Sequence, residues 1–120
     1  MYVRRMTWDD ACAIAREFPA VEGGSYHGYP ALRVAGKFLM RLSDDGLSIE
    51  FKALEFGERE MLLGAFPGVF HIPPAFGGRG VFARLSKLDD TTLRELLERR
   101  WRRVAPRELV RAYDRQSART

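Results

Sequence analysis

Apolar residues recur every three or four positions in several segments of the chain, which is the spacing of an amphipathic helix. The first of these segments starts at Thr7, which can form a capping box with Asp10, and it ends before Pro19. Three more helices are predicted, over 58–66, 90–104 and 106–113.

One residue interrupts the apolar stripe of the helix expected at 90–104. Leu93, Leu97 and Trp101 repeat at helical spacing, and by angle Arg100 falls among them. An arginine in such a stripe either extends its long stem to the surface or pairs with an acidic side chain. The sequence leaves both possibilities open.

Between the helices, apolar and polar residues alternate, which is the pattern of a half-buried strand. The clearest case is 47–52, where Leu47, Ile49 and Phe51 alternate with polar residues. Gly36 separates two such segments and indicates a tight hairpin. The other predicted strands span 22–27, 31–35, 37–42, 69–72 and 81–86.

Length and composition place the chain among small globular proteins. It has 120 residues, 46% of them hydrophobic and 30% charged, with no repeat or linker, so we expect one domain. No apolar run approaches the ~18 residues of a membrane span, and no secretory signal is visible at the start. A single cysteine, Cys12, fits a reducing cytoplasm and is expected to be a core or edge thiol. We therefore expect a cytoplasmic monomer.

The positive charge is concentrated at the end of the chain. The net charge is +4, and residues 91–120 alone hold nine arginines against four acidic residues. Such a basic region favours an anionic partner, most often nucleic acid. A second interpretation is a solvated helix supported by pairs such as Arg94 with Glu98, four residues apart.

Several types of chemistry lack their residue patterns. The Gly77–Gly80 loop has no lysine and precedes a strand, so it is not a phosphate loop. His27 and His71 are far apart in sequence, and no serine has a nucleophile-elbow setting. The acidic residues of the first helix are better explained as partners of its dipole than as iron ligands. We expect no enzymatic activity, metal or cofactor.

Seven short segments, in order and at similar spacing, carry a resemblance to a known family. They are 6–10 (MTWDD), 18–22 (FPAVE), 28–38 (GYPALRVAGKF), 58–63 (EREMLL), 70–74 (FHIPP), 80–85 (GVFARL) and 95–107 (ELLERRWRRVAPR). The sequence resembles the MmcQ/YjbR family of small bacterial proteins.

The resemblance implies an α+β fold of the CyaY or frataxin type. An antiparallel sheet would carry helices on one face and leave the other face partly open, with an extra helix at the C-terminus. The matched domain would span 6–113, after an N-terminal extension over 1–5 and before a frayed tail over 114–120. Members of the family are labelled DNA-binding because of a "double-wing" arrangement of strands.

Strand alternation then predicts which side chains occupy the open face. If Leu32, Val34, Phe38, Met40 and Phe51 point into the core, a set of basic residues shares the opposite face with Glu50 and Phe82. These basic residues are Arg33, Lys37, Arg41, Lys52 and Arg84, with Arg79 in the adjoining loop. A second basic patch is predicted at Arg102, Arg103 and Arg107.

Basic side chains beside an aromatic ring suit DNA phosphates and an unstacked base. We therefore predict a non-enzymatic DNA-binding protein whose binding is weak, sensitive to salt and tolerant of sequence. The alternative is a protein-interaction or small-ligand module, for which Tyr26, Tyr29 and Phe76 would supply a shallow surface.

Overall fold

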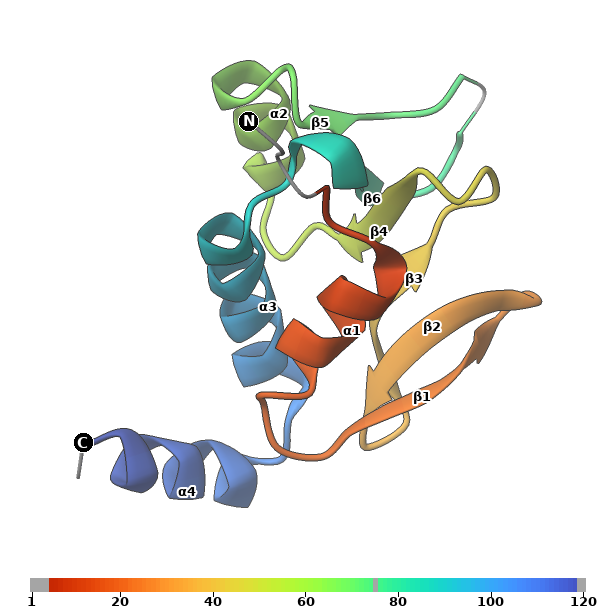
Figure 1. Cartoon of the computed structure of the whole chain (residues 1–120). Helices are drawn as coiled ribbons and strands as arrows, with labels where there is room; N and C mark the ends of the chain where they lie inside the picture. The colour runs from red at the N-terminus through yellow and green to blue at the C-terminus, as the bar shows by residue number, and fades with distance from the viewer. Residues whose placement is uncertain (1–4, 75, 119–120) are drawn as a thin grey trace.

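The computed structural model describes residues 5–74 and 76–118. Its helices and strands follow one another along the chain in the order shown in Figure 1. They are α1 (Trp8–Ala15), β1 (Val21–Tyr26), β2 (Tyr29–Val34), β3 (Lys37–Leu42), β4 (Ser48–Lys52), α2 (Glu58–Ala65), β5 (Phe70–His71), β6 (Gly80–Arg84), a 3-10 turn (Leu85–Lys87), α3 (Asp90–Val104) and α4 (Arg107–Ala118).

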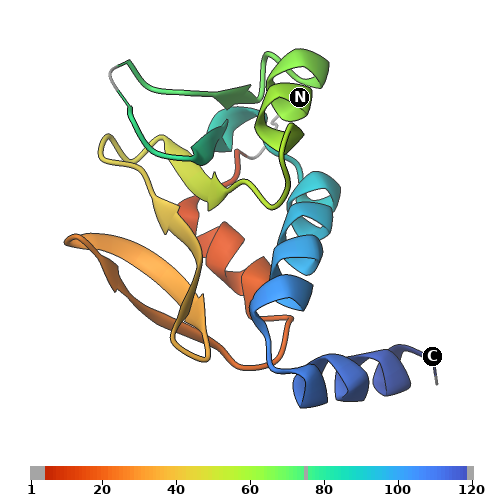
Figure 2. The same cartoon turned by 180° about the vertical axis from the view of Figure 1, so that it is seen from behind.

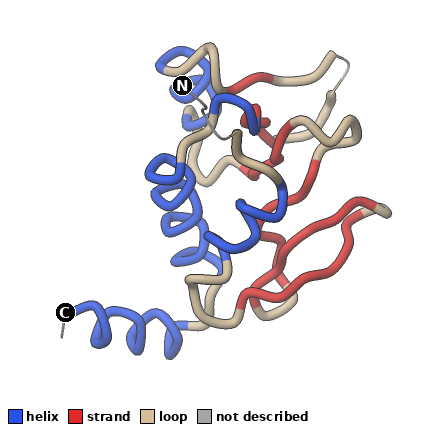
Figure 3. The backbone as a smooth tube through the Cα atoms, in the orientation of Figure 1, coloured by secondary structure: helices blue, strands red, loops and turns tan. Residues whose placement is uncertain are grey.

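The six strands form one antiparallel sheet in the order β1-β2-β3-β4-β6-β5. The helices α1 and α3 lie together on one side of this sheet, as the tube in Figure 3 shows. The predicted α+β class, with an antiparallel sheet and a C-terminal helix, is confirmed. The finer frataxin-like assignment stays a prediction.

The core lies between the sheet and the two helices. Trp101 of α3 is completely buried, and its indole nitrogen donates to the Pro19 carbonyl at 2.8 Å. The predicted capping box is present at the start of α1, where Thr7 and Asp10 exchange hydrogen bonds. The central buried side chains are Leu32, Val34, Met40, Ile49, Phe51, Val81, Leu93 and Leu97.

An irregularity in β3 changes which of its residues face the core. The register pairs Leu32 with Met40 but Arg33 with Phe38, so Leu39 is an extra residue on β3. Leu39 is buried in the core. Phe38 therefore lies on the opposite face, contrary to the alternation prediction, which has no means of anticipating one extra residue.

Two tight turns set the hairpins at this end of the sheet. Ala35 and Gly36 both have positive φ between β2 and β3, which confirms the hairpin predicted from Gly36. His27 and Gly28 have the same conformation between β1 and β2. The β1–β2 hairpin and the loop before β6 extend to the same side of the molecule, away from the helices (Figures 1 and 2).

The last helix differs from its predicted length. α4 continues to Ala118, five residues past the predicted end at Tyr113, so the predicted frayed tail is helical as far as the structure describes it. Tyr113 attaches α4 to the body, because its ring lies 5.8 Å from that of Phe18 and 5.0 Å from that of Trp101. Of the predicted 1–5 extension, only Arg5 lies within the described residues.

Arg100 has the acidic partner that the sequence leaves unidentified. Its guanidinium donates to Glu58 Oε1 at 2.7 Å, and both side chains are buried. The same oxygen accepts the backbone N–H of Leu54 at 2.9 Å. This pair connects α3 to the start of α2 beneath Phe51, whose ring centroid lies 5.3 Å from the guanidinium carbon.

Candidate functional site

Two hollows adjoin on the sheet face that α1 and α3 leave uncovered, with Phe76 and Arg41 lining both. The first, of about 430 Å³, is called the groove here, and the second has a volume of about 420 Å³. The groove is lined by Tyr26, His27, Arg41, Glu50, Lys52, Phe76, Gly78, Arg79 and Gly80. The second hollow is lined by Arg41, Ser43, Asp44, Asp45, His71, Pro73, Pro74, Phe76 and Phe82.

Phe76 forms the wall between the two hollows, and its ring is fixed by two neighbours. It meets the buried Phe82 edge-on at 5.1 Å between centroids. On its other side it lies so close to Gly78 that an added Cβ would stand 2.7 Å from Phe76 Cζ. Glycine at this position therefore lets the loop fold back over the ring.

Arg41 is buried and paired, contrary to its predicted role as an exposed phosphate contact. Its Nε donates to Glu50 Oε1, and a second nitrogen donates to Asp44 at 3.0 Å. The guanidinium also lies over the rings of Tyr29 and Phe82, at 5.2 and 5.6 Å. Burial alone would lower the pKa of Arg41, but the hydrogen bonds to the two carboxylates outweigh it and raise the pKa.

Three other residues that were predicted to contact DNA from this face do not line the groove. Arg33 donates to the carbonyls of Gly36 and Ser25 at 3.4 and 3.2 Å. Lys37 pairs in register with the core residue Val34 and so lies on the opposite face. Arg84 lines a separate cavity of about 710 Å³ at the far end of β6.

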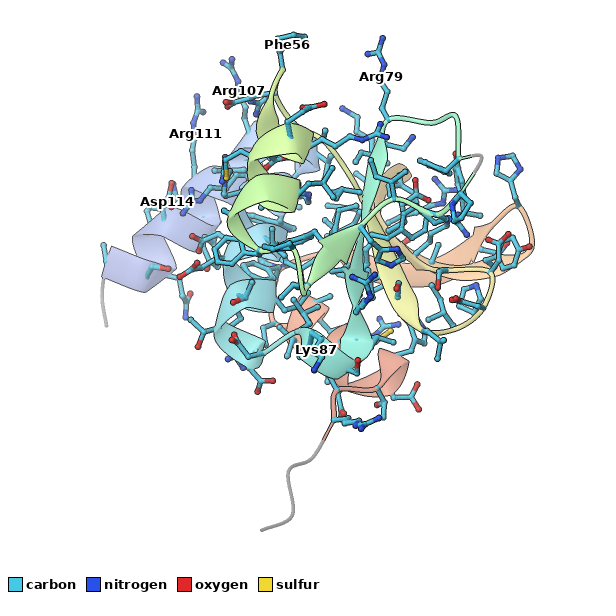
Figure 4. The ribbon with its side chains drawn as sticks, turned by 90° about the horizontal axis from the view of Figure 1, so that it is seen from above. Phe56, Arg79, Lys87, Arg107, Arg111 and Asp114 are labelled. Atoms are coloured by element: carbon cyan, nitrogen blue, oxygen red, sulfur yellow. The ribbon has the colours of Figure 1, made fainter. Side chains whose placement is uncertain are left out.

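Lys52 and Arg79 are the predicted sheet-side residues that the structure brings together at the groove. Lys52 Nζ lies 5.0 Å from the Phe38 ring centroid and 5.6 Å from that of Tyr26. Arg79 is exposed and projects away from the body in Figure 4. Neither cation forms an ion pair with any residue of 5–74 or 76–118.

The arginines of α3 are paired with acidic side chains. Arg94 holds Glu17 through two hydrogen bonds of 2.8 and 2.9 Å. The predicted patch residues Arg102 and Arg103 donate to Asp114 and Glu55, at 2.9 and 3.0 Å. Two members of the predicted second patch are therefore already neutralised, by acids 12 and 48 positions away in sequence.

The arginines of α4 are free of such partners. Arg107, the third predicted patch residue, is exposed and has no ion pair among the described residues, and Arg111 and Arg115 share both properties. Figure 4 shows Arg107 and Arg111 projecting outward from the helix, toward the same side of the molecule as Arg79. The sequence analysis counted Arg111 and Arg115 in the basic region but did not single them out as contacts.

Ser48 and His71 form a polar pair that the sequence analysis missed. Ser48 Oγ lies 2.9 Å from His71 Nε2. Burial, aided by the charge of Arg84, lowers the pKa of His71, so its ring is neutral at pH 7. Ser48 is only 2% exposed, and it lines, together with His71, the cavity of about 710 Å³ at the far end of β6. Only strand pairing joins these residues, since they stand 23 positions apart.

The described part of the chain has neither a metal-binding cluster nor a helix that could span a membrane. Residues 5–74 and 76–118 contain no group of three or more His, Cys, Asp or Glu side chains placed to hold a metal ion. None of the helices in these ranges is both long and apolar enough to cross a membrane. The lone thiol, Cys12, is half-buried, and this burial raises its pKa to about 11.

The chain is similar to three mycobacterial proteins. They are Uncharacterized protein Rv2570 and Uncharacterized protein MT2646 of Mycobacterium tuberculosis, and Uncharacterized protein Mb2600 of Mycobacterium bovis. Each is 28% identical to this chain over an alignment of 125 residues, which covers 89% of this chain and 95% of the relative. No protein-family model and no solved structure matches the chain. The resemblance to the MmcQ/YjbR family stays a prediction.

Proposed function

We propose that the protein binds DNA without enzymatic activity, through weak and sequence-tolerant contacts to phosphates. The observation that carries this proposal is that five exposed cations, at the groove and along α4, have no acidic partner in the described residues. Lys52 and Arg79 stand at the groove, and Arg107, Arg111 and Arg115 follow one another along α4. Each is free to release counterions from a nucleic-acid backbone when it binds.

The spacing on α4 suits a row of phosphates. The three arginines are four residues apart, which is about 6 Å along the helix axis and leaves them on one side of it. Arginine offers a planar fork of donors that matches phosphate oxygens. The opposite side of the helix is engaged with the body through Tyr113, so the arginine side is the one turned outward.

Phosphate contacts of this kind carry no sequence information, because every nucleotide offers the same backbone. The proposed contacts are all long basic side chains at a strand end, in a loop and on an exposed helix surface. This supports sequence-tolerant binding. It also makes salt the main control of affinity, because counterion release is the driving term.

Fluorescence anisotropy across a salt series tests the proposal, with labelled single- and double-stranded DNA and an acidic polypeptide as a polyanion control. Five phosphate contacts predict a slope of log affinity against log salt of about −4.5 for duplex DNA. The triple variant R107Q/R111Q/R115Q should make that slope shallower by about three.

The matched control is R94Q/R102Q/R103Q, which removes the same number of arginines from paired positions. Its slope should stay close to that of the wild type, because those guanidinium groups already neutralise carboxylates. Equal losses in both triple variants would show that total charge, and not the free α4 arginines, sets the affinity. Absence of binding at low salt would remove the proposal.

A second candidate is a protein-interaction module, favoured by exposed apolar side chains near α2. Phe56 is fully exposed, and Met61 and Phe66 are about half exposed. Large apolar side chains gathered in this way are typical of a docking surface. Association through them would persist at high salt, where phosphate binding is lost. Sedimentation of the wild type and of Phe56→Ser at high salt tests it, and identical monomer profiles would count against it.

A further inference from the structure

We propose that the groove receives one unstacked nucleobase that carries an exocyclic amino group, such as cytosine, from a single strand of DNA. This inference rests on the proposed function and names the part of the ligand that enters the groove. It is carried by three features of the lining, which are two fixed aromatic rings, one carboxylate oxygen without a hydrogen bond, and two free cations.

The aromatic rings are held in place before any ligand arrives. Tyr26 meets Phe38 edge-on at 5.0 Å and His27 at 4.4 Å between centroids. Phe76 is fixed between Phe82 and Gly78. Rings of this kind in a single-strand site stack against exposed bases. A base within a duplex is already stacked and paired, so this lining selects a single strand.

The carboxylate belongs to Glu50, which lines the groove between Arg41 and Gly80. Glu50 Oε1 accepts a hydrogen bond from Arg41 Nε. Glu50 Oε2 accepts no hydrogen bond from residues 5–74 or 76–118 and lies over Gly80, where an added Cβ would stand 2.1 Å away.

This free oxygen gives the groove its selectivity among bases. A carboxylate accepts a hydrogen bond from the amino group of cytosine, whereas thymine presents a carbonyl oxygen at the equivalent position. Thymine would place two acceptors against each other. The groove therefore favours a base with an exocyclic amine over thymine.

The cations and the size of the groove complete the match. Lys52 and Arg79 line the same groove as Glu50, so a base directed at the carboxylate leaves its phosphates beside two positive charges. The volume of about 430 Å³ is near the lower end of ligand pockets, which run from roughly 300 to 1,000 Å³. It suits one nucleotide unit and not a stacked duplex.

The test compares three labelled strands of equal length by anisotropy at low salt: oligo-dC, oligo-dT and a fully abasic strand. We expect oligo-dC to bind about fivefold more tightly than either of the others. Equal affinity for all three strands, with a steep salt slope, would overturn the base site and leave the phosphate-binding function standing. No binding to any strand would overturn both.

Variants locate the effect in the groove. Glu50→Gln should abolish the preference for oligo-dC, and Phe76→Ala should lower oligo-dC affinity to that of the abasic strand. Phe56→Ala is the matched control, because it removes an exposed phenyl group that does not line the groove. Circular dichroism checks that Glu50→Gln is folded, and Phe76→Ala tests the site independently if it is not.

A final arm separates a strand from a free nucleotide, which offers the same base and phosphate. Unlabelled dCMP competes against labelled oligo-dC. We expect displacement only at concentrations far above those of unlabelled oligo-dC, since one nucleotide cannot also reach α4. Displacement by dCMP at the same concentrations as oligo-dC would overturn the strand as the ligand.

Discussion

The arginines of α3, and Arg41 on the uncovered sheet face, are held by acidic side chains, whereas those on α4 have no acidic partner in the described residues. Each arginine of either group adds one positive charge to the chain. In the first group each positive charge already faces a carboxylate, as Arg41 faces Glu50 and Arg100 faces Glu58. In the second group the charge is available to a partner. Basic residues therefore act as structural cross-links in one region and, under the proposed function, as binding groups in the other.

The sharpest test of this difference is substitution of a buried, paired arginine. Arg41→Gln removes the ion-pair partner of the buried Glu50, so we expect a loss of about 3 kcal/mol in the free energy of unfolding. Urea denaturation followed by circular dichroism measures it. Charge reversal at Arg41 would lower the free energy of unfolding further. This residue is therefore unsuitable for testing DNA contacts.

The distinction between paired and free arginines is wrong if Arg41→Gln is as stable as the wild type. Arg79→Gln is the matched control, since it removes an unpaired arginine that lines the same groove. We expect its stability to change by less than about 0.5 kcal/mol. Comparable losses of stability in Arg41→Gln and Arg79→Gln would mean that pairing with a carboxylate does not decide how much an arginine stabilises the fold.

The packing around Glu50 predicts the next largest effect. In Gly80→Ala the new Cβ would lie 2.1 Å from Glu50 Oε2 and 2.8 Å from its Cγ and Cδ, so the carboxylate must leave Arg41 or the strand must shift. We expect a loss of about 1–3 kcal/mol, typical of an overpacked site. The thermal midpoint measures this loss, and Gly24→Ala in β1, where nothing lies within 4 Å of the added Cβ, is the control. An unchanged midpoint for Gly80→Ala would show that Glu50 moves freely.

Local features of the fold could be predicted from the sequence, and long-range ones could not. The Thr7 cap and the Gly36 turn depend on residues that are neighbours in sequence, so the pattern identifies them. The extra residue Leu39 leaves no trace in the alternation. The Arg100–Glu58 pair joins residues 42 positions apart, and only the packing of α3 beside α2 brings them together.

The same distinction applies to the candidate site. Exposure of Lys52, Arg79 and Arg107 follows from their position at strand ends, in a Gly-rich loop and on a terminal helix. Neutralisation of Arg103 depends on Glu55, which is 48 positions away and gives no sequence signal at all. Counting basic residues therefore finds the regions rich in positive charge but does not distinguish free cations from paired ones.

His71 makes the stability of the fold depend on pH. Its pKa is lowered first by burial and then by Arg84, so the unfolded chain takes up the proton more readily than the folded chain. Stability is therefore lost as pH falls through the ordinary pKa of histidine, about 6.5. We expect the urea midpoint to drop between pH 7.5 and about pH 5.5, and His71→Gln to flatten that drop.

The exposed His27 supplies the control, because its substitution should leave the pH profile of the wild type unchanged. The carboxylates do not obscure this window. Asp45 and Asp89 have pKa values lowered by hydrogen bonds from Ser43 and Thr92, so the stability that they contribute is lost only at more acidic pH. A drop that persists in His71→Gln would assign the pH dependence to another group.

The smallest expected effect on stability falls on the free arginines. R107Q/R111Q/R115Q should change the free energy of unfolding by less than about 0.5 kcal/mol per residue, since exposed side chains without partners contribute little to folding. The paired control R94Q/R102Q/R103Q should lose more, because it breaks ion pairs that join α3 to Glu17, Asp114 and Glu55. R107Q/R111Q/R115Q should thus keep its stability and have a shallower salt slope of DNA binding. R94Q/R102Q/R103Q should lose stability and keep the salt slope of the wild type. If one variant lost both properties and the other lost neither, structural and binding arginines would not be separable by their partners.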